Sequence, residues 1–341
     1  MSGLIIAIVV LLGIVVLAQI MKVSEVSSAL RDGADNKVSE RDNDIQGTLM
    51  FLVGTLFIVS VIWMYFAWGD RLLPKPASEH GAEIDALWDV SMIIINIVFF
   101  IVQPILFWFA FRYRGKKGQR ASYYEHNNKL EFIWTIIPAL ALAVLIIWGL
   151  NTWGSIMNPE NEEEPIVVEL YAQQFAWTAR YSGTDNQLGY ANVHLIDGTN
   201  ALGVDMGDLN SADDIISKEI HLPVGKPVLF KFRSQDVIHS AYMPHFRAQM
   251  NCVPGMTTQF QFTPTVTTSE MQADPYVIDQ INAINEIRVA TGEDPYDFGY
   301  VLLCNKICGA AHYNMQLPII VESEEEYNAW LREQKTIAES L

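Results

Sequence analysis

The sequence predicts a membrane protein in two parts, a set of apolar helices followed by an all-β domain. Half of the residues are hydrophobic, yet the net charge is −17. Residues 1–153 carry 12 basic and 13 acidic side chains, whereas residues 154–341 carry 10 and 26, so the second part is strongly acidic. After residue 165, long apolar runs give way to short alternating ones, which are typical of strands.

Four apolar runs have about the length needed to cross a bilayer. Tryptophans fall near their ends, where amphipathic rings favour the membrane interface. The first run has no basic segment before it and no clear cleavage site after it, which favours a retained helix over a signal peptide. The runs cover about residues 4–21, 48–68, 91–111 and 133–153.

The basic residues of the short loops predict the orientation. Six Arg and Lys side chains crowd residues 112–129, between the third and fourth runs, so this connection is expected in the cytoplasm. Counting spans then places residues 22–47 inside as a polar loop and everything after residue 153 outside. The N-terminus is expected outside as well.

The second part reads as a β-sandwich or barrel. Its expected strands are residues 166–170, 175–181, 193–196, 219–222, 227–233, 258–263, 300–303 and 318–322. Residues 268–297 have a helical period instead and form an expected insertion. The predicted organisation is an extra helix at 1–21, a loop at 22–47, a second helix at 48–68, a connector and hairpin at 69–153, the β domain at 154–323, and a charged tail at 324–341.

The strongest motif is Cys-x3-Cys-x3-His-x2-Met, formed by Cys304, Cys308, His312 and Met315. Thiolate and thioether are soft ligands, and together with imidazole they favour copper over magnesium or calcium. A disulfide between the two cysteines would leave the histidine and methionine unexplained. A structural zinc site has no use for methionine. A chance cluster on a loop is the remaining alternative.

His239 supplies a further candidate ligand after the strand expected to end near residue 233. A mononuclear blue-copper site needs two His, one Cys and a weak Met, so the second cysteine is in excess. Two thiolates with two imidazoles suit two coppers bridged by both sulfurs. The third cysteine, Cys252, is expected to be a small buried side chain.

Together these residues resemble subunit II of the haem-copper respiratory oxidases, the cytochrome c oxidase branch. The resemblance covers about residues 89–321 outside the insertion. It is carried by the Cys-His-Met motif and by three segments: Asp-Val-Ile-His-Ser at 236–240, Val-Pro-Gly at 253–255 and Leu-Glu-Phe-Ile-Trp-Thr-Ile-Ile-Pro at 130–138. It implies a transmembrane hairpin and a cupredoxin domain with a dinuclear copper A centre. The implied location is the bacterial plasma membrane, with the copper domain and both termini on the extracytoplasmic side.

The resemblance also implies the copper ligands. Both cysteines of the motif would bridge the metals. His239 and Met315 would complete one copper, and His312 with the main-chain carbonyl of Lys306 the other. The family usually has Glu at the position of Lys306, where its carboxylate also reaches a magnesium ion. A lysine cannot do so, and magnesium binding is therefore doubtful.

Two further sites follow from the resemblance. The family tends to read Gln-Trp-x-Trp where this chain has Phe175 and Trp177, and the first Trp is the entry point for electrons. Phe175, Trp177 or Tyr171 is expected near that route, although simple packing explains such aromatics equally well. Glu131 matches a glutamate at the mouth of a proton channel. From its position alone it is a carboxylate at the start of a helix.

The function implied is electron entry into a respiratory cytochrome c oxidase. Electrons from cytochrome c would pass through the copper pair to haem in subunit I, where oxygen is reduced and protons are pumped. The expected partners are subunit I, other oxidase subunits, membrane lipid, and a basic cytochrome c or cytochrome c domain steered by the acidic surface, which repels nucleic acid. The chain has no Cys-x-x-Cys-His motif for a covalent haem. A quinol-oxidase subunit would lack the copper ligands, and a copper chaperone would not need the Glu131 segment.

Overall fold

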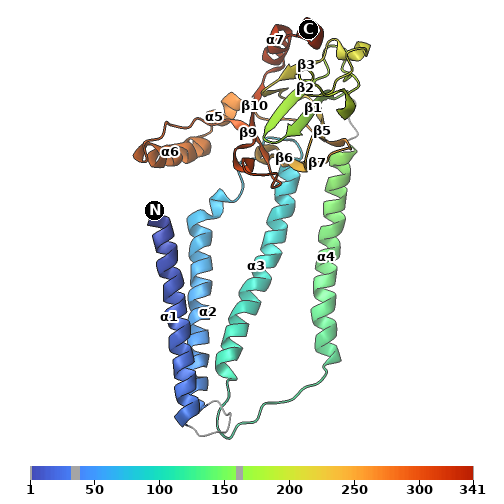
Figure 1. Ribbon diagram of the computed structural model, residues 1–341. Helices are drawn as coiled ribbons and strands as arrows, with labels where there is room; N and C mark the ends of the chain where they lie inside the picture. Colours follow the sequence, from blue (N-terminus) through green and yellow to red (C-terminus); the bar gives the residue numbers. More distant parts are fainter. Residues whose placement is uncertain (1, 32–38, 159–163, 341) are drawn as a thin grey trace. The chain divides into compact units, whose positions relative to one another are not determined.

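The computed structural model describes residues 2–31, 39–158 and 164–340 (Figure 1). The chain divides into two compact units, Met1–Leu72 with Ser91–Ile137 and Leu73–Val90 with Pro138–Leu341. The first unit is helical. The second contains the β domain and the helix ends that adjoin it.

Four apolar helices make up the N-terminal part, as predicted. They are α1 (Ser2–Arg31), α2 (Glu40–Trp68), α3 (Gly81–Arg112) and α4 (Asn128–Met157). Each contains a stretch long and apolar enough to cross a membrane, with mean hydropathies of 1.8, 2.3, 2.5 and 2.4. Few of their side chains are buried within the described chain, as expected for helices that are apolar all round and span a bilayer.

The segment expected as a polar loop, residues 22–47, is largely helical where it is described. α1 continues to Arg31 and α2 begins at Glu40, while residues 32–38 lie outside the described chain. The side chain of Ser39 caps α2 by accepting a hydrogen bond from the Asp42 N–H at 3.2 Å. The polar residues here therefore continue and cap helices.

Inside the first unit, α2 packs against α3 and the turn that follows it. Gly54 has no room for a side chain, since an added Cβ would lie 2.2 Å from the ring of Phe107. One end of the contact is closed by an ion pair of 2.6 Å between Arg114 and Asp44. The helix predicted at residues 48–68 is thus in direct contact with α3, the first helix of the predicted hairpin.

The β domain consists of two five-stranded sheets (Figure 1). The first has the order β3-β2-β1-β5-β8 and the second β4-β10-β9-β6-β7, with β1–β5 and β4–β10 parallel and the other pairs antiparallel. The strands are β1 (Ile166–Gln173), β2 (Ala176–Tyr181), β3 (Ile215–Ser217), β4 (Ile220–Pro223), β5 (Val228–Ser234), β6 (His239–Met243), β7 (Ala248–Cys252), β8 (Thr258–Phe262), β9 (Tyr300–Cys304) and β10 (Gln316–Glu322).

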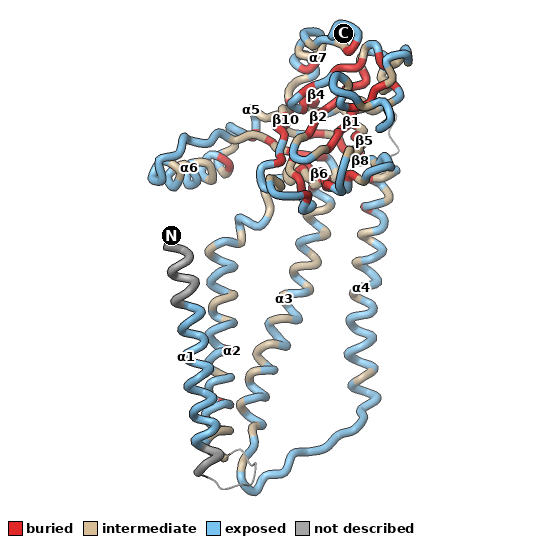
Figure 2. The backbone as a smooth tube through the Cα atoms, viewed as in Figure 1, coloured by how far each residue is buried: buried red, intermediate tan, exposed pale blue. Residues whose placement is uncertain are grey.

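The core lies between the two sheets, where the buried segments in Figure 2 are concentrated. On β5 the alternate residues Val228, Phe230 and Phe232 are buried, and on β10 so are Leu317 and Ile319. Side chains on a strand alternate between its two faces, so each sheet turns one apolar face inward. This arrangement confirms the predicted β-sandwich.

Some local predictions for the sandwich were wrong. Residues 193–196, expected as a strand, contain a short 3-10 helix, Val193–Leu195, capped by the side chain of Asn192. Strands β3, β6 and β7 were not predicted. β3 lies in a Gly- and Asp-rich segment, and β6 carries His, Ser and Tyr, so neither shows the apolar alternation on which the prediction depends.

The predicted helical insertion is present between β8 and β9. It contains α5 (Thr268–Gln272) and the longer α6 (Pro275–Ala290). The side chain of Asp274 caps α6 and forms an ion pair with Lys75. The charged tail forms α7 (Glu324–Glu333) and the short α8 (Ile337–Ser340). Trp330 of α7 stacks on His221 with ring centroids 4.1 Å apart, which fixes the tail on the sandwich.

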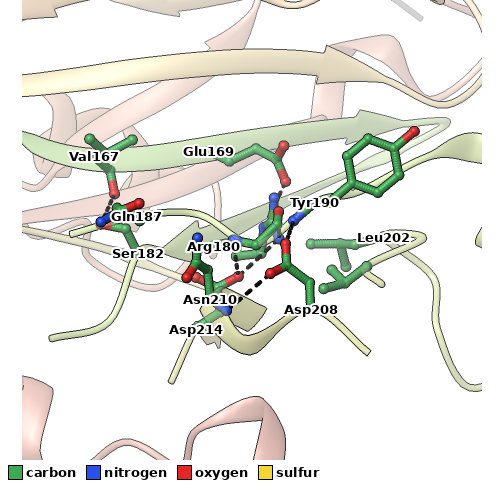
Figure 3. Close-up of polar contacts among 12 residues, drawn as sticks. Val167, Glu169, Arg180, Ser182, Gln187, Tyr190, Leu202, Asp208, Asn210 and Asp214 are labelled. Atoms are coloured by element: carbon green, nitrogen blue, oxygen red, sulfur yellow. Dashed lines mark hydrogen bonds and ion pairs between the residues drawn. The ribbon is translucent and has the colours of Figure 1, made fainter. Parts of the chain in front are cut away.

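A buried ionic network lies on the first sheet (Figure 3). Arg180 on β2 is 2% exposed, and its guanidinium lies 2.9 Å from Glu169 and 3.0 Å from Asp214. Glu169 also pairs with Arg233 of β5 at 3.1 Å. Arg180 donates a further hydrogen bond to the Gly189 carbonyl at 3.0 Å. The network therefore holds the loop after β2 on the sheet, a contact that no local sequence pattern predicts.

Candidate metal centre

Strand pairing brings the motif at 304–315 to His239. β6 begins at His239 and runs antiparallel to β9, which ends at Cys304, so that Ala241 lies opposite Cys304. The Cys304 N–H donates to the Met315 carbonyl at 3.1 Å, which closes the loop between β9 and β10. The Asn305 N–H donates to the Ser240 carbonyl at 2.9 Å. The candidate ligands thus stand at the ends of adjoining strands.

All five predicted side-chain ligands come together. The sulfurs of Cys304 and Cys308 are 3.9 Å apart. Cys304 Sγ is 3.7 Å from His239 Nδ1, and Cys308 Sγ is 3.6 Å from His312 Nδ1. Cys308 Sγ also lies 3.8 Å from the Met315 sulfur. A disulfide would need a sulfur separation of about 2.05 Å, so the two cysteines are free.

The main-chain carbonyl oxygen of Lys306 lies 3.3 Å from Cys304 Sγ. The Lys306 side chain is exposed and brings no carboxylate to the cluster. Met315 lies against Cys308 and the Lys306 carbonyl against Cys304.

The cluster is largely dry. His239 is 0% exposed, Met315 1% and Cys308 4%. Burial, the hydrogen bond to Cys304 and the charge of Cys304 raise the pKa of the Cys308 thiol to about 11. Without a metal this thiol is protonated at neutral pH, so a metal ion must displace its proton on binding. Cys252, fully buried as predicted, has a pKa raised to about 12 by burial.

The structure also reveals two neighbours of the cluster that were not predicted as site residues. Asp236 lies 2.8 Å from His239 Nε2. Gln174, in the turn between β1 and β2, donates its backbone N–H to Asp236 at 2.7 Å and its side-chain amide to the Cys308 carbonyl. The signal for Asp236 was its place three residues before a candidate histidine. Gln174 stands at the Gln of the family's Gln-Trp-x-Trp, but no sequence pattern predicts its contacts with Asp236 and Cys308, which lie on other loops.

Of the three predicted electron-entry aromatics, two lie at the cluster. The Trp177 ring is 6.1 Å from the His239 ring, and its N–H donates to the Met315 carbonyl at 3.4 Å. Phe175 is 36% exposed and lies against Gly309, where an added Cβ would be 2.7 Å from its ring.

Tyr171 lies elsewhere. It is buried in a small apolar group with Leu202, Val204 and Ile337, and its ring lies 5.1 Å from the guanidinium of Arg233. It therefore does not share the surroundings of the cluster.

Glu131 lies in the first turn of α4. Its carboxylate accepts a hydrogen bond from the Asn127 N–H at 3.1 Å, and the Asn127 side chain accepts one from the Leu130 N–H at 3.1 Å. This reciprocal pairing caps the helix. The proton-channel role stays a prediction.

A helical membrane part followed by a β-sandwich, with a buried cluster of thiols, imidazoles and a thioether at its strand ends, defines a class of membrane-anchored proteins with a cupredoxin-like domain. Residues 66–151 match the family described as the transmembrane domain of cytochrome c oxidase subunit II, and residues 166–271 match its periplasmic domain. The chain belongs to the cytochrome c oxidase subunit II family.

Individual relatives agree. The alternative cytochrome c oxidase subunit 2 of Bradyrhizobium diazoefficiens is 34% identical over 266 residues, covering 77% of this chain and 84% of the relative. Cytochrome c oxidase subunit 2 of Thermostichus vulcanus is 26% identical over 306 residues, covering 82% and 84%. A solved periplasmic domain of subunit II from Bradyrhizobium japonicum is 18% identical, covers 50% of this chain and 93% of that chain, and has a TM-score of 0.30, too low to add weight.

The family assignment and the four apolar helices make this chain a membrane protein with an extracytoplasmic β domain. The periplasmic-domain match ends at residue 271, before the motif at 304–315. The cluster geometry is therefore separate support for a metal centre.

Proposed function

We propose that this chain is the electron-entry subunit of a respiratory cytochrome c oxidase. In this proposal it accepts electrons from cytochrome c at a dinuclear copper centre and passes them to haem in subunit I. The observation that carries the proposal is the pair of sulfurs 3.9 Å apart, each with an imidazole nitrogen 3.6–3.7 Å away. Membership of the subunit II family supports it independently.

The donor set fits copper. Two thiols, two imidazoles and a thioether combine soft and borderline donors, the chemistry that copper prefers. Cys304 and Cys308 would bridge the metals, and the remaining ligands would come from His239, His312, Met315 and the Lys306 carbonyl. When bound, the copper pair supplies a one-electron carrier.

The protein itself would hold the metal ligands rigidly and shield them from water. The ligands stand on paired strands and on a loop closed by main-chain hydrogen bonds, so little rearrangement is needed when charge changes. Burial of His239 and Met315 excludes water from the inner side. Phe175 is the one predicted entry aromatic that reaches the surface, which supports an entry route near Gly309.

The negative charge of the β domain favours a basic electron donor, because opposite charges steer two proteins together. This donor would be a soluble cytochrome c or a cytochrome c domain of a larger assembly. Subunit I and other oxidase subunits complete the enzyme, with Glu131 at the mouth of a proton channel. The proposed location is a bacterial plasma membrane with both termini on the extracytoplasmic side. Lys306 supplies no carboxylate, so the proposal includes no magnesium ion at this position.

Metal analysis of the purified full chain tests the proposal. Two coppers per chain with a mixed-valence EPR signal are expected, whereas zinc or no metal would contradict it. Absence of copper would favour the alternative in which the sandwich is structural, as in a quinol oxidase. In the assembled oxidase, His312→Asn should abolish oxidation of cytochrome c, and Arg332→Met on the exposed tail should leave it unchanged.

A further inference from the structure

The two imidazoles at the cluster have different surroundings. His239 is fully buried, and its Nε2 lies 2.8 Å from Asp236 Oδ1. His312 is half-buried, and the described residues offer its Nε2 no hydrogen-bond partner. One imidazole is therefore paired with a carboxylate and the other is not.

Asp236 is itself held in place from several sides. Its Oδ2 accepts the Gln174 N–H at 2.7 Å, and its Oδ1 accepts the Val237 N–H at 2.7 Å as well as the His239 ring N–H. The side chain keeps 29% exposure. Two backbone N–H groups from two loops thus hold the carboxylate beside the ring nitrogen of His239.

This contact determines which nitrogen of His239 carries the proton. A neutral imidazole carries one N–H, and the Asp236 carboxylate can only accept, so the proton belongs on Nε2. The lone pair of Nδ1 then points toward Cys304 Sγ, 3.7 Å away. A carboxylate on the far nitrogen also makes an imidazole ligand more basic and favours the more positive state of a bound metal.

Building on the proposed copper function, we propose that Asp236 is a positioning residue that fixes His239 in the ligating tautomer and lowers the reduction potential of the centre. It acts through His239, whereas none of the residues that the structure describes places a carboxylate on His312 in the same way. Gln174 supports it with its backbone N–H and links it to the loop of Cys308 through its side-chain amide.

The test uses the full chain loaded with copper ions and compares Asp236→Asn with the wild type. The control is Asp208→Asn, which removes the same charge from a carboxylate that accepts hydrogen bonds from the Tyr190 and Asn210 amides. The oxidised-to-reduced ratio at a fixed potential should fall about tenfold in Asp236→Asn, a rise of about 59 mV. The control should match the wild type.

Proton NMR of the oxidised chain supplies a second measurement. One imidazole N–H should exchange slowly with solvent in the wild type and become fast in Asp236→Ala. An intact copper EPR signal with an unchanged potential in Asp236→Asn would overturn this inference alone. A wild-type chain that binds no copper would overturn the proposed function and this inference with it.

Weaker copper uptake in Asp236→Asn is also informative. A loss of affinity of about 10- to 100-fold, confined to this variant and recovered by Asp236→Glu, supports the positioning role. Failure of Asp236→Glu to recover uptake, or an equal loss in Asp208→Asn, would overturn it.

Discussion

The sandwich buries two polar clusters that differ in one respect. In the ionic network of Figure 3, Arg180 meets Glu169 and Asp214 at 2.9 and 3.0 Å, so opposite charges are in direct contact. In the sulfur cluster the nearest side-chain ligand atoms are 3.6–3.9 Å apart, and none of them carries a compensating charge. The charges of the network compensate one another within the protein. The sulfur cluster has the donors and the spacing of a site that a metal completes.

The difference predicts that the network governs stability and the sulfur cluster governs binding. Breaking a buried ion pair by removing one partner costs about 3–5 kcal/mol, since it leaves an uncompensated buried charge. Arg180→Met should therefore destabilise the chain by about this amount, seen as a lower unfolding midpoint of the full chain in detergent. Arg332→Met, on the exposed face of α7, should stay within about 0.5 kcal/mol. Equal effects of the two would contradict the structural role of the network.

Cys308→Ser should abolish copper binding and leave the stability of the metal-free chain nearly unchanged. Removing one bridging sulfur should abolish the two-copper signal, because no other described side chain can replace it. In metal-free chain, the unfolding midpoint should change little, since Ser is close to Cys in size and its hydroxyl can bond nearby polar groups. Copper content and circular dichroism measured on one sample separate the two effects. Retention of two coppers would refute the bridging assignment.

Asp214 supplies a pH test of the network. Burial raises its pKa to about 6 from a usual 3.8, although Arg180 lowers it. A carboxyl with a raised native pKa adds stability that is fully present below pH 3.8 and is lost as the pH rises through about 6. The stability of the wild type relative to Asp214→Asn should therefore fall between about pH 4 and pH 7. A constant difference in unfolding midpoint across this range would argue against the raised pKa.

Lys306→Ala should have the smallest effect. The candidate ligand at this position is the main-chain carbonyl, and the side chain is exposed. Copper content and the EPR signal should match those of the wild type. Loss of copper in this variant would show that the lysine side chain, and not only its carbonyl, supports the centre.

Local sequence patterns were sufficient for part of this protein. The membrane helices follow from apolar runs of bilayer length, because a bilayer imposes that length on any spanning helix. The motif from Cys304 to Met315 could be identified because its members lie within twelve consecutive residues. The alternation of apolar residues predicted most of the strands. The strand predicted at residues 193–196 was wrong, because the side chain of Asn192 caps a short 3-10 helix there. Such a cap does not appear in the pattern of apolar residues.

The sequence by itself determined the membrane helices, the β class of the second part and the donor types of the metal motif, because each depends on residues close together in the chain. Only the tertiary structure decided that His239 stands beside Cys304, since that contact depends on the register between β6 and β9. The same holds for Gln174, which contacts Asp236 and the Cys308 carbonyl, and for Arg180 between Glu169 and Asp214. These groups meet through strand pairing and contacts between loops, and a partner distant in sequence leaves no periodic signal.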